Sequence, residues 1–200
     1  MRFQEAYQKL VQEKYYVFSF EDLSAFYPQE NRGNLRQYLS RWKKNGWIGH
    51  LRKGFYELRS LEGRGVPDFF IANTIYAPSY ISMETALSYY SLIPEVAMAV
   101  VSITSKITRQ FKNSHGLFIY RSVRPEAFRG YVIEKHQGFD VLIAEPEKAL
   151  VDYLYFKTLR GVKFDRRAER LDQKKVTRLN RKKMKHYARL YHLDLKELYA

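Results

Sequence analysis

The sequence predicts an α+β protein in two parts, a helical unit that ends in a hairpin and a larger α/β region with a helical tail. Apolar residues repeat with a helical period at both ends of the chain, whereas short apolar runs bounded by turn residues occupy the middle. The 200 residues are 46% hydrophobic and 16% aromatic, which is enough to bury a core in one or two domains.

Two helical patterns open the chain. Apolar side chains recur on one helical face from Phe3 to Val11. A second helix is expected to begin at Ser19, because the acidic residue Asp22 follows three positions later and the two form a capping sequence. Pro28 is expected to stop this helix, because a proline ring clashes with the preceding helical turn.

A third helix and a hairpin complete the first part. Apolar residues at the spacing i, i+3, i+4 and i+7 run from Leu35 to Trp42, and Asn45-Gly46 is a suitable helix end. Two short extended runs follow, and Arg52-Lys53-Gly54 joins them as a hairpin turn. Three helices and a basic-tipped hairpin predict a winged helix over residues 1–60. The glycines and proline of residues 61–68 predict a linker that lets the two parts act independently.

Residues 69–200 predict a small α/β domain with a basic helical tail from about residue 158, and leave the strand order open. Ser82 is expected to cap a helix that reaches Leu92, Glu145-Pro146-Glu147 to open a second helix, and Asp172 to cap the main helix of the tail. Strands are expected from Ala97 to Thr104, Leu117 to Arg121, Tyr131 to Glu134 and Phe139 to Ala144; the first and last are apolar enough to be central.

The net charge of +14 gathers at the two ends of the chain. Residues 1–60 hold 11 Lys and Arg against 6 Asp and Glu, residues 61–156 hold 9 against 10, and residues 157–200 hold 15 against 5. Basic surfaces attract polyanions, most often nucleic acid, although charge also serves solubility alone. The charge pattern therefore favours a nucleic-acid ligand.

The outward face of the third helix is the most specific of these features. Arginine reads guanine bidentately, asparagine and glutamine read adenine, and in helix-turn-helix proteins the start of this helix enters the major groove. No acid occurs between Asn31 and Gly54, which favours DNA, although many winged helices bind protein instead. The base-reading candidates are Arg32, Asn34, Arg36 and Gln37, and the phosphate-contacting candidates are Arg41, Lys43, Lys44, Arg52 and Lys53.

The basic tail is a second candidate surface. It could touch DNA, RNA or an acidic protein, or it could be a solvated face that only supports the domain. Its candidate residues are Lys174, Lys175, Arg178, Arg181, Lys182, Lys183, Lys185 and Arg189.

Several classes of protein are disfavoured by what the sequence lacks. Without cysteine there are no disulfides, thiolate metal sites or cysteine nucleophile. The first residues do not have the apolar run of a signal peptide, and the longest apolar stretch, from Val96 to Val101, is too short to cross a bilayer. We therefore expect a cytoplasmic protein with no membrane segment, no metal and no cofactor.

Catalytic motifs are also missing, which favours a regulator over an enzyme. The sequence contains no phosphate-binding glycine loop, no His-Glu-x-x-His pair and no nucleophile elbow. The one catalytic alternative is a metal-dependent nuclease built on Asp140, Glu145 and Lys148, which would use these residues around a Mg²⁺ ion. Helix capping explains Glu145 and Glu147 more simply.

Several segments resemble the AbiEi antitoxins of AbiE-type abortive-infection, or type IV toxin–antitoxin, systems. The likeness lies in Asn45-Gly46-Trp47-Ile48 and Arg52-Lys53-Gly54-Phe55-Tyr56-Glu57-Leu58, and it continues through Tyr80 to Leu87, Leu92-Ile93-Pro94 and Val141 to Asp152. It covers roughly residues 1–160, and the order of the segments is more telling than any one of them.

The resemblance implies a division of labour. The winged helix would bind inverted repeats in its own promoter and repress the operon, and the C-terminal domain would counter a nucleotidyltransferase-like toxin, with or without direct contact. A plain winged-helix regulator that has lost the toxin role is an alternative, and so is an adaptor whose winged helix binds protein.

Overall fold

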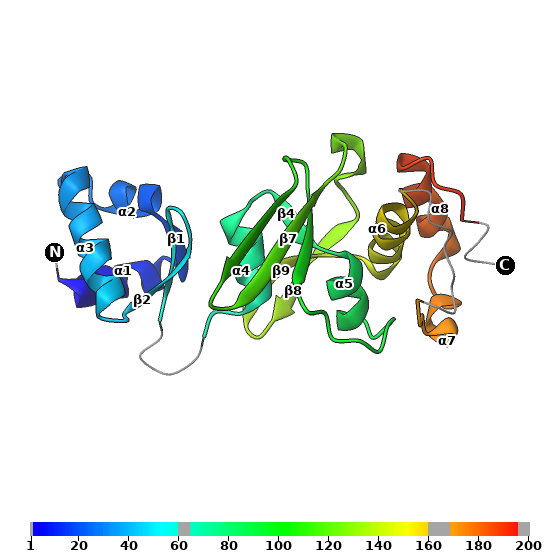
Figure 1. Cartoon of the computed structure of the whole chain (residues 1–200), viewed down its shortest axis with the longest axis horizontal. Coiled ribbons are helices and arrows are strands. Elements are labelled where there is room, and N and C mark those ends of the chain that lie inside the picture. The colour runs from blue at the N-terminus through cyan, green and yellow to red at the C-terminus, as the bar shows by residue number, and fades with distance from the viewer. Residues whose placement is uncertain (1, 60–64, 160–168, 196–200) are drawn as a thin grey trace.

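The computed structural model describes residues 2–59, 65–159 and 169–195, and it is mixed α+β, as the sequence predicts. Eight α-helices and two sheets lie within these residues (Figure 1). We call residues 2–59 the N-terminal unit, and residues 65–159 with 169–195 the main unit. No helix in either unit has the length and apolarity needed to cross a membrane.

The N-terminal unit packs three helices against a small antiparallel sheet with strand order β1-β3-β2. The predicted capping box is confirmed: the Ser19 hydroxyl accepts the Asp22 N–H at 3.0 Å, and the Asp22 carboxylate accepts the Ser19 N–H at 2.6 Å. The sequence did not predict β1, because three residues are too few to show a period of two. The elements are α1 (Phe3–Gln12), β1 (Val17–Ser19), α2 (Phe20–Phe26), α3 (Arg32–Lys44), β2 (Ile48–Arg52) and β3 (Phe55–Leu58).

The main unit is built on a six-stranded mixed sheet with strand order β6-β7-β5-β4-β9-β8. Helix α4 covers one face, and α5 and α6 cover the other, with α7 and α8 outside α6 (Figure 1). The strands are β4 (Ser79–Ile81), β5 (Val100–Thr104), β6 (Arg109–Asn113), β7 (Gly116–Ser122), β8 (Tyr131–His136) and β9 (Phe139–Ala144). The helices are α4 (Asp68–Ile75), α5 (Met83–Tyr89), η1 (Pro125–Ala127), α6 (Pro146–Thr158), α7 (Gln173–Val176) and α8 (Arg181–Leu190).

Strands β5 and β9, expected to be central, both lie inside the sheet, whereas β4, β6 and α4 were not predicted. Strand β4 is short, and the polar residues of β6 suit its place at the edge of the sheet. Helix α4 contacts β4, β5 and β9 of the sheet and β1 of the N-terminal unit. It is therefore apolar around much of its circumference, and its sequence lacks a one-sided stripe.

The helix expected from Ser82 to Leu92 begins as predicted, with Ser82 at the N-cap position, but it ends early, at Tyr89. The Ser82 hydroxyl does not cap α5 but donates to the buried Asp152 carboxylate at 2.7 Å. Ser91 takes a left-handed conformation, and the Leu92 N–H bonds to the Leu87 carbonyl at 2.7 Å. This closing motif ends the helix before Leu92.

The tail contains two helices where one was expected. Asp172 does cap a helix, accepting the Lys175 N–H, but α7 is only one turn long. Asn180 then caps α8 by accepting the backbone N–H groups of Lys182 and Lys183. A new helix therefore begins at Arg181, within the stretch that was predicted as one helix.

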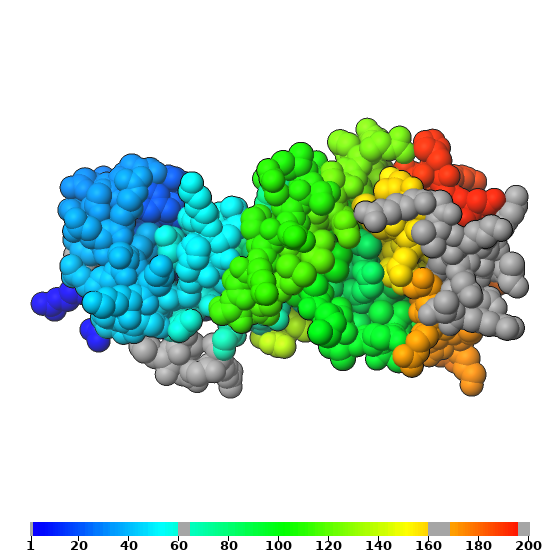
Figure 2. Space-filling view, in the orientation of Figure 1, coloured from blue at the N-terminus to red at the C-terminus, as the bar shows by residue number. Residues whose placement is uncertain are grey.

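The two units are in contact with each other (Figure 2). The predicted linker had led us to expect two parts that act independently. Val17 and Leu51 of the N-terminal unit belong to the hydrophobic core of the main unit. The His115 ring lies between two carboxylates, 2.7 Å from Glu57 in β3 and 2.8 Å from Asp68 in α4. Hydrogen bonds to Asp68 and Glu57 raise the pKa of His115 to about 9, so the ring is charged at neutral pH.

A glycine makes this contact possible. Gly49 stands opposite Glu57 in the β2–β3 pair, and a Cβ atom there would lie 2.2 Å from the Glu57 carboxylate. Any other residue would push this buried side chain away from His115. The two units are therefore joined by a specific polar contact as well as by apolar packing.

Candidate nucleic-acid interface

Helix α3 is fixed by its buried side and by its first turn. Leu35, Leu39 and Trp42 are almost completely buried in the core of the N-terminal unit. Asn31 caps the helix by accepting the Asn34 N–H at 2.8 Å, and Gly46, with φ of +74°, follows the helix end as predicted. The opposite face of α3 is consequently held outward as a rigid surface.

That outward face is cationic and polar along its whole length. Arg36 and Gln37 lie on it near the start, and Arg41 and Lys44 lie near the end, all of them exposed. At about 100° per residue these positions form one stripe, with Ser40 at its centre. Gly33 lies on the same stripe in the first turn and adds no side chain there. The phosphate candidate Lys43 is exposed as well.

Two of the predicted base-reading residues are already engaged at the edges of this stripe. Arg32 forms two hydrogen bonds with Glu21, of 3.0 and 2.7 Å, and its guanidinium lies 4.6 Å from the Phe20 ring centroid. The bond from Arg32 lowers the pKa of the Glu21 carboxyl. The Asn34 amide donates to Glu30 at 3.4 Å. Arg32 and Asn34 must leave these carboxylates before they can contact a base.

Arg52 is placed differently from the prediction. It was expected to contact phosphate from the hairpin, but its Nε donates to the Ile75 carbonyl at 2.6 Å, and its guanidinium stacks 4.1 Å from the Phe55 ring centroid. Burial lowers the pKa of Arg52. The side chain therefore links the two units, and Lys53 is the exposed cation of this turn.

The candidates of the basic tail fall into two groups. Lys183 forms an ion pair with Glu145 at 2.8 Å, and Lys175 donates to the Ser91 carbonyl at 3.0 Å, so both hold the tail against the rest of the main unit. The remaining candidates have exposed side chains. They are Lys174, Arg178, Arg181, Lys182, Lys185 and Arg189.

The residues of the nuclease alternative do not converge on one site. Asp140 is exposed and pairs with Lys135 at 2.7 Å. Glu145 accepts hydrogen bonds from Lys183 and Tyr187, and Lys148 is fully buried. Among the described residues no cluster of His, Asp and Glu could hold a metal ion.

Helix α6 begins where the sequence predicts, with Glu145 at the N-cap position and Pro146 next to it, but no side chain caps the helix. The carboxylates of Glu145 and Glu147 instead bind groups of α8 and of its cap residue. Besides the bonds to Glu145, the Glu147 carboxylate accepts the Asn180 N–H at 2.8 Å. Burial would raise the pKa of Glu145, but the bonds from Lys183 and Tyr187 outweigh it and lower that pKa. Glu145 and Glu147 thus hold the basic tail to the rest of the main unit.

A buried polar cluster, unforeseen from the sequence, lies beneath the tail. Lys148 and Asp152 form an ion pair one helical turn apart in α6, with neither side chain exposed. The Lys148 ammonium also lies 2.9 Å from the hydroxyls of Tyr80 and Tyr191, and Ser82 and Tyr191 donate to Asp152. Burial lowers the pKa of Lys148, whereas Asp152 opposes that shift. The cluster connects β4, α6 and the residue that ends α8.

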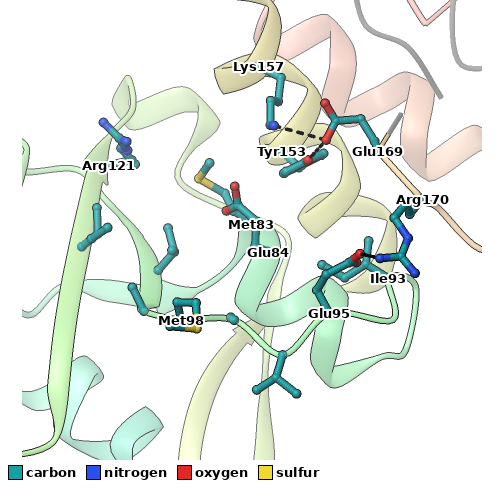
Figure 3. Close-up of a pocket in the computed structure, with 15 residues that line it drawn as sticks. Met83, Glu84, Ile93, Glu95, Met98, Arg121, Tyr153, Lys157, Glu169 and Arg170 are labelled. Carbon is teal, nitrogen blue, oxygen red and sulfur yellow. Dashed lines mark hydrogen bonds and ion pairs between the residues drawn. The ribbon is translucent and has the colours of Figure 1, made fainter. Parts of the chain in front are cut away.

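A pocket of about 480 Å³ lies on the α5–α6 side of the sheet, and its lining residues are drawn in Figure 3. Most charged side chains that line this pocket already have ion-pair partners within the chain: Glu95 pairs with Arg170 at 2.6 Å, and Glu169 pairs with Lys157 at 3.2 Å. Its apolar wall includes Met83 and the fully exposed Met98. All its lining residues belong to the main unit, and none is a predicted site residue.

In comparisons with known proteins, no protein-family model matches the chain, and no curated protein is significantly similar to it.

Proposed function

We propose that the N-terminal unit is a winged helix-turn-helix that binds duplex DNA through α3, and that the protein regulates transcription. The observation that carries this proposal is the exposed stripe of α3, where Arg36, Gln37, Arg41 and Lys44 project from a rigid helix. No acidic residue interrupts the sequence from Asn31 to Gly54. In this proposal Arg36 and Gln37 read bases, while Arg41, Lys43, Lys44 and Lys53 contact phosphates.

The placement of Arg32, Asn34 and Arg52 refines this proposal. Arg32 and Asn34 are held by Glu21 and Glu30, so they are secondary readers that act only after exchanging a carboxylate for DNA. Arg52 does not take part in the proposed interface, because its guanidinium lies against the main unit.

The resemblance to AbiEi antitoxins supports a more specific function, autorepression at promoter inverted repeats together with neutralisation of a nucleotidyltransferase-like toxin. Two of the resembling segments, Tyr80 to Leu87 and Val141 to Asp152, pair as β4 and β9 and supply most of the buried polar cluster. They therefore specify the inside of the main unit. The toxin-directed role rests on the resemblance alone.

Salt dependence tests DNA binding directly. If the protein neutralises about four to six phosphates, its affinity for duplex DNA should fall roughly 10²- to 10³-fold between 50 and 200 mM salt. Fluorescence anisotropy with the full chain measures this. Arg41→Ala with Lys44→Ala should reduce the salt slope by about two, whereas Lys174→Ala with Arg178→Ala in the tail should change it less. A flat salt response would contradict DNA binding and favour the adaptor.

A growth-rescue assay tests the antitoxin role. In cells that express a nucleotidyltransferase encoded beside this protein, the full chain should restore growth. Arg36→Ala with Arg41→Ala should still restore it, because neutralisation is assigned to the main unit. If wild-type protein binds its promoter but does not rescue growth, the protein is a plain regulator.

A further inference from the structure

The two edge strands of the six-stranded sheet differ in what lies beside them. Strand β6, at one edge, lies beside β2 of the N-terminal unit, where the Asn113 amide donates to the Leu51 carbonyl at 3.2 Å. Strand β8, at the other edge, has β9 as its only strand partner among the described residues. An open edge is a template for a further strand.

The backbone groups that face this open edge can be identified. The Glu145 N–H donates to the Gly130 carbonyl at 2.9 Å, which places the even-numbered residues of β8 in hydrogen-bonded pairs with β9. The Leu142 N–H and carbonyl confirm the alternation, because they bond to the Asn73 side chain and not to Ile133 opposite. The N–H and carbonyl groups of Tyr131, Ile133 and Lys135 therefore point away from β9.

This edge lacks the usual protection against strand pairing. It contains no proline and no bulge, and Ile133 is 69% exposed. Lys135 could act as a guarding charge, but its ammonium is bound to Asp140 of β9 at 2.7 Å. The lysine is thus drawn toward its own hairpin and away from the open side.

We propose that β8 pairs with β8 of a second copy of this chain, antiparallel, around a two-fold axis at Ile133. An axis perpendicular to the sheet keeps equivalent faces together, so odd-numbered residues must oppose odd-numbered ones. With the axis at Ile133, Ile133 meets its counterpart, and each Tyr131 stands opposite Lys135. Both pairs then exchange N–H···O bonds through the groups that face outward.

Charge selects this register over its two neighbours. An axis at Val132 would place Lys135 opposite Arg129, and an axis at Glu134 would place two glutamates directly opposite each other. Like charges in opposed positions destabilise a strand pair. The Ile133 register instead sets an exposed apolar residue against itself and a lysine against a tyrosine ring.

The resulting dimer is small and weak, because one strand pair buries less than the roughly 1,200 Å² of a stable interface. It assembles one continuous sheet through both copies and brings two N-terminal units into a two-fold arrangement. Such symmetry matches an inverted repeat in DNA. The pairing does not depend on DNA, so it can fail while the proposed DNA binding stands.

Single-cysteine cross-linking tests the pairing, since the natural chain has no cysteine. Residues in a hydrogen-bonded antiparallel pair have Cα atoms about 5.5 Å apart, a distance that a disulfide spans. Under mild oxidation, Ile133→Cys should form covalent dimers at least about tenfold faster than Ile107→Cys, because pairing raises the effective thiol concentration. Ile107 is a matched control, 62% exposed on the connection between β5 and β6.

Two further measurements decide register and reversibility. Glu134→Cys should cross-link more slowly than Ile133→Cys, and the reverse order would overturn the register. In sedimentation experiments the wild type should show concentration-dependent self-association that Ile133→Lys abolishes and Ile107→Lys preserves. Equal cross-linking of Ile133→Cys and Ile107→Cys, or a wild type that stays monomeric at high concentration, would overturn the proposal.

Discussion

The stripe of α3 and the basic tail carry the same kinds of side chain but differ in what lies beneath them. Under α3 the core is purely apolar, made by Leu35, Leu39 and Trp42, so its cations have no counter-charge below the helix. Under α8 lie the carboxylates of Glu145 and Glu147, and deeper the Lys148–Asp152 pair. Part of the charge of the tail therefore serves to fasten it.

A count of lysines and arginines therefore does not identify a ligand surface. Residues 157–200 are more basic than residues 1–60, yet two tail candidates, Lys175 and Lys183, turn toward the main unit. In α3 the contacts with acids lie at the first turn, where Arg32 pairs with Glu21 and the Asn34 amide donates to Glu30.

Removing the anchor beneath the tail should have the largest effect. Asp152→Ala leaves the Lys148 ammonium buried without its counter-charge, which should lower the free energy of unfolding by about 3–5 kcal/mol. Urea denaturation measures the loss. Lys148→Met with Asp152→Leu should recover part of it, because an apolar pair leaves no buried charge. A loss below about 1 kcal/mol for Asp152→Ala would mean that the pair does not anchor the tail.

Substitutions of exposed cations on α3 and on the hairpin turn should weaken DNA binding and leave the stability of the fold unchanged. Arg36→Ala should weaken binding to a selected operator by about 1–3 kcal/mol and relax the preference at particular base pairs. Lys53→Ala should weaken operator and random DNA alike, because phosphate contacts carry no sequence information. Competition titrations against random duplex separate the two. If Arg36→Ala lowers the affinity for operator and random DNA equally, Arg36 does not read bases.

The contact that joins the two units should depend on pH. Because the pKa of His115 rises from 6.5 to about 9 on folding, its bonds to Glu57 and Asp68 stabilise the protein fully below pH 6.5. That stabilisation, on the order of 1–3 kcal/mol, should be lost as the pH rises to about 9. Melting curves from pH 6 to 10 should show His115→Gln converging on the wild type at high pH. Parallel curves would argue against a charged His115.

The surface ion pair of the tail should contribute least. Lys183→Ala breaks the contact with Glu145, whose partners are both partly exposed, and should cost about 0.5 kcal/mol. Lys182→Ala, next to it in α8, should leave stability unchanged. The same two variants compared in DNA titrations show whether the tail also touches DNA: Lys182→Ala weakens binding only if it does.

Much of the N-terminal unit could be predicted from local sequence. The capping box at Ser19, the end of α3 at Gly46 and the apolar stripe from Leu35 to Trp42 each depend on residues within one or two turns. The outward positions of Arg36, Gln37 and Arg41 follow from that stripe, because a helix with one buried face must expose the other. The main unit was harder, since β4 and β6 depend on partners far away in the chain.

The helical periods, the main turns and the placement of charge at the two ends of the chain are all readable from the residues in order. Which of those charges are free to meet a ligand depends on the folded chain. Arg52 and Lys53 are neighbours in one turn, yet the first lies against the main unit and the second is exposed. Lys148, which the sequence offered only as a residue of the nuclease alternative, lies at the centre of a buried cluster. The physical reason is that local sequence fixes where a side chain leaves its own helix or strand, whereas burial, ion pairing and an open sheet edge depend on what the rest of the chain brings against it.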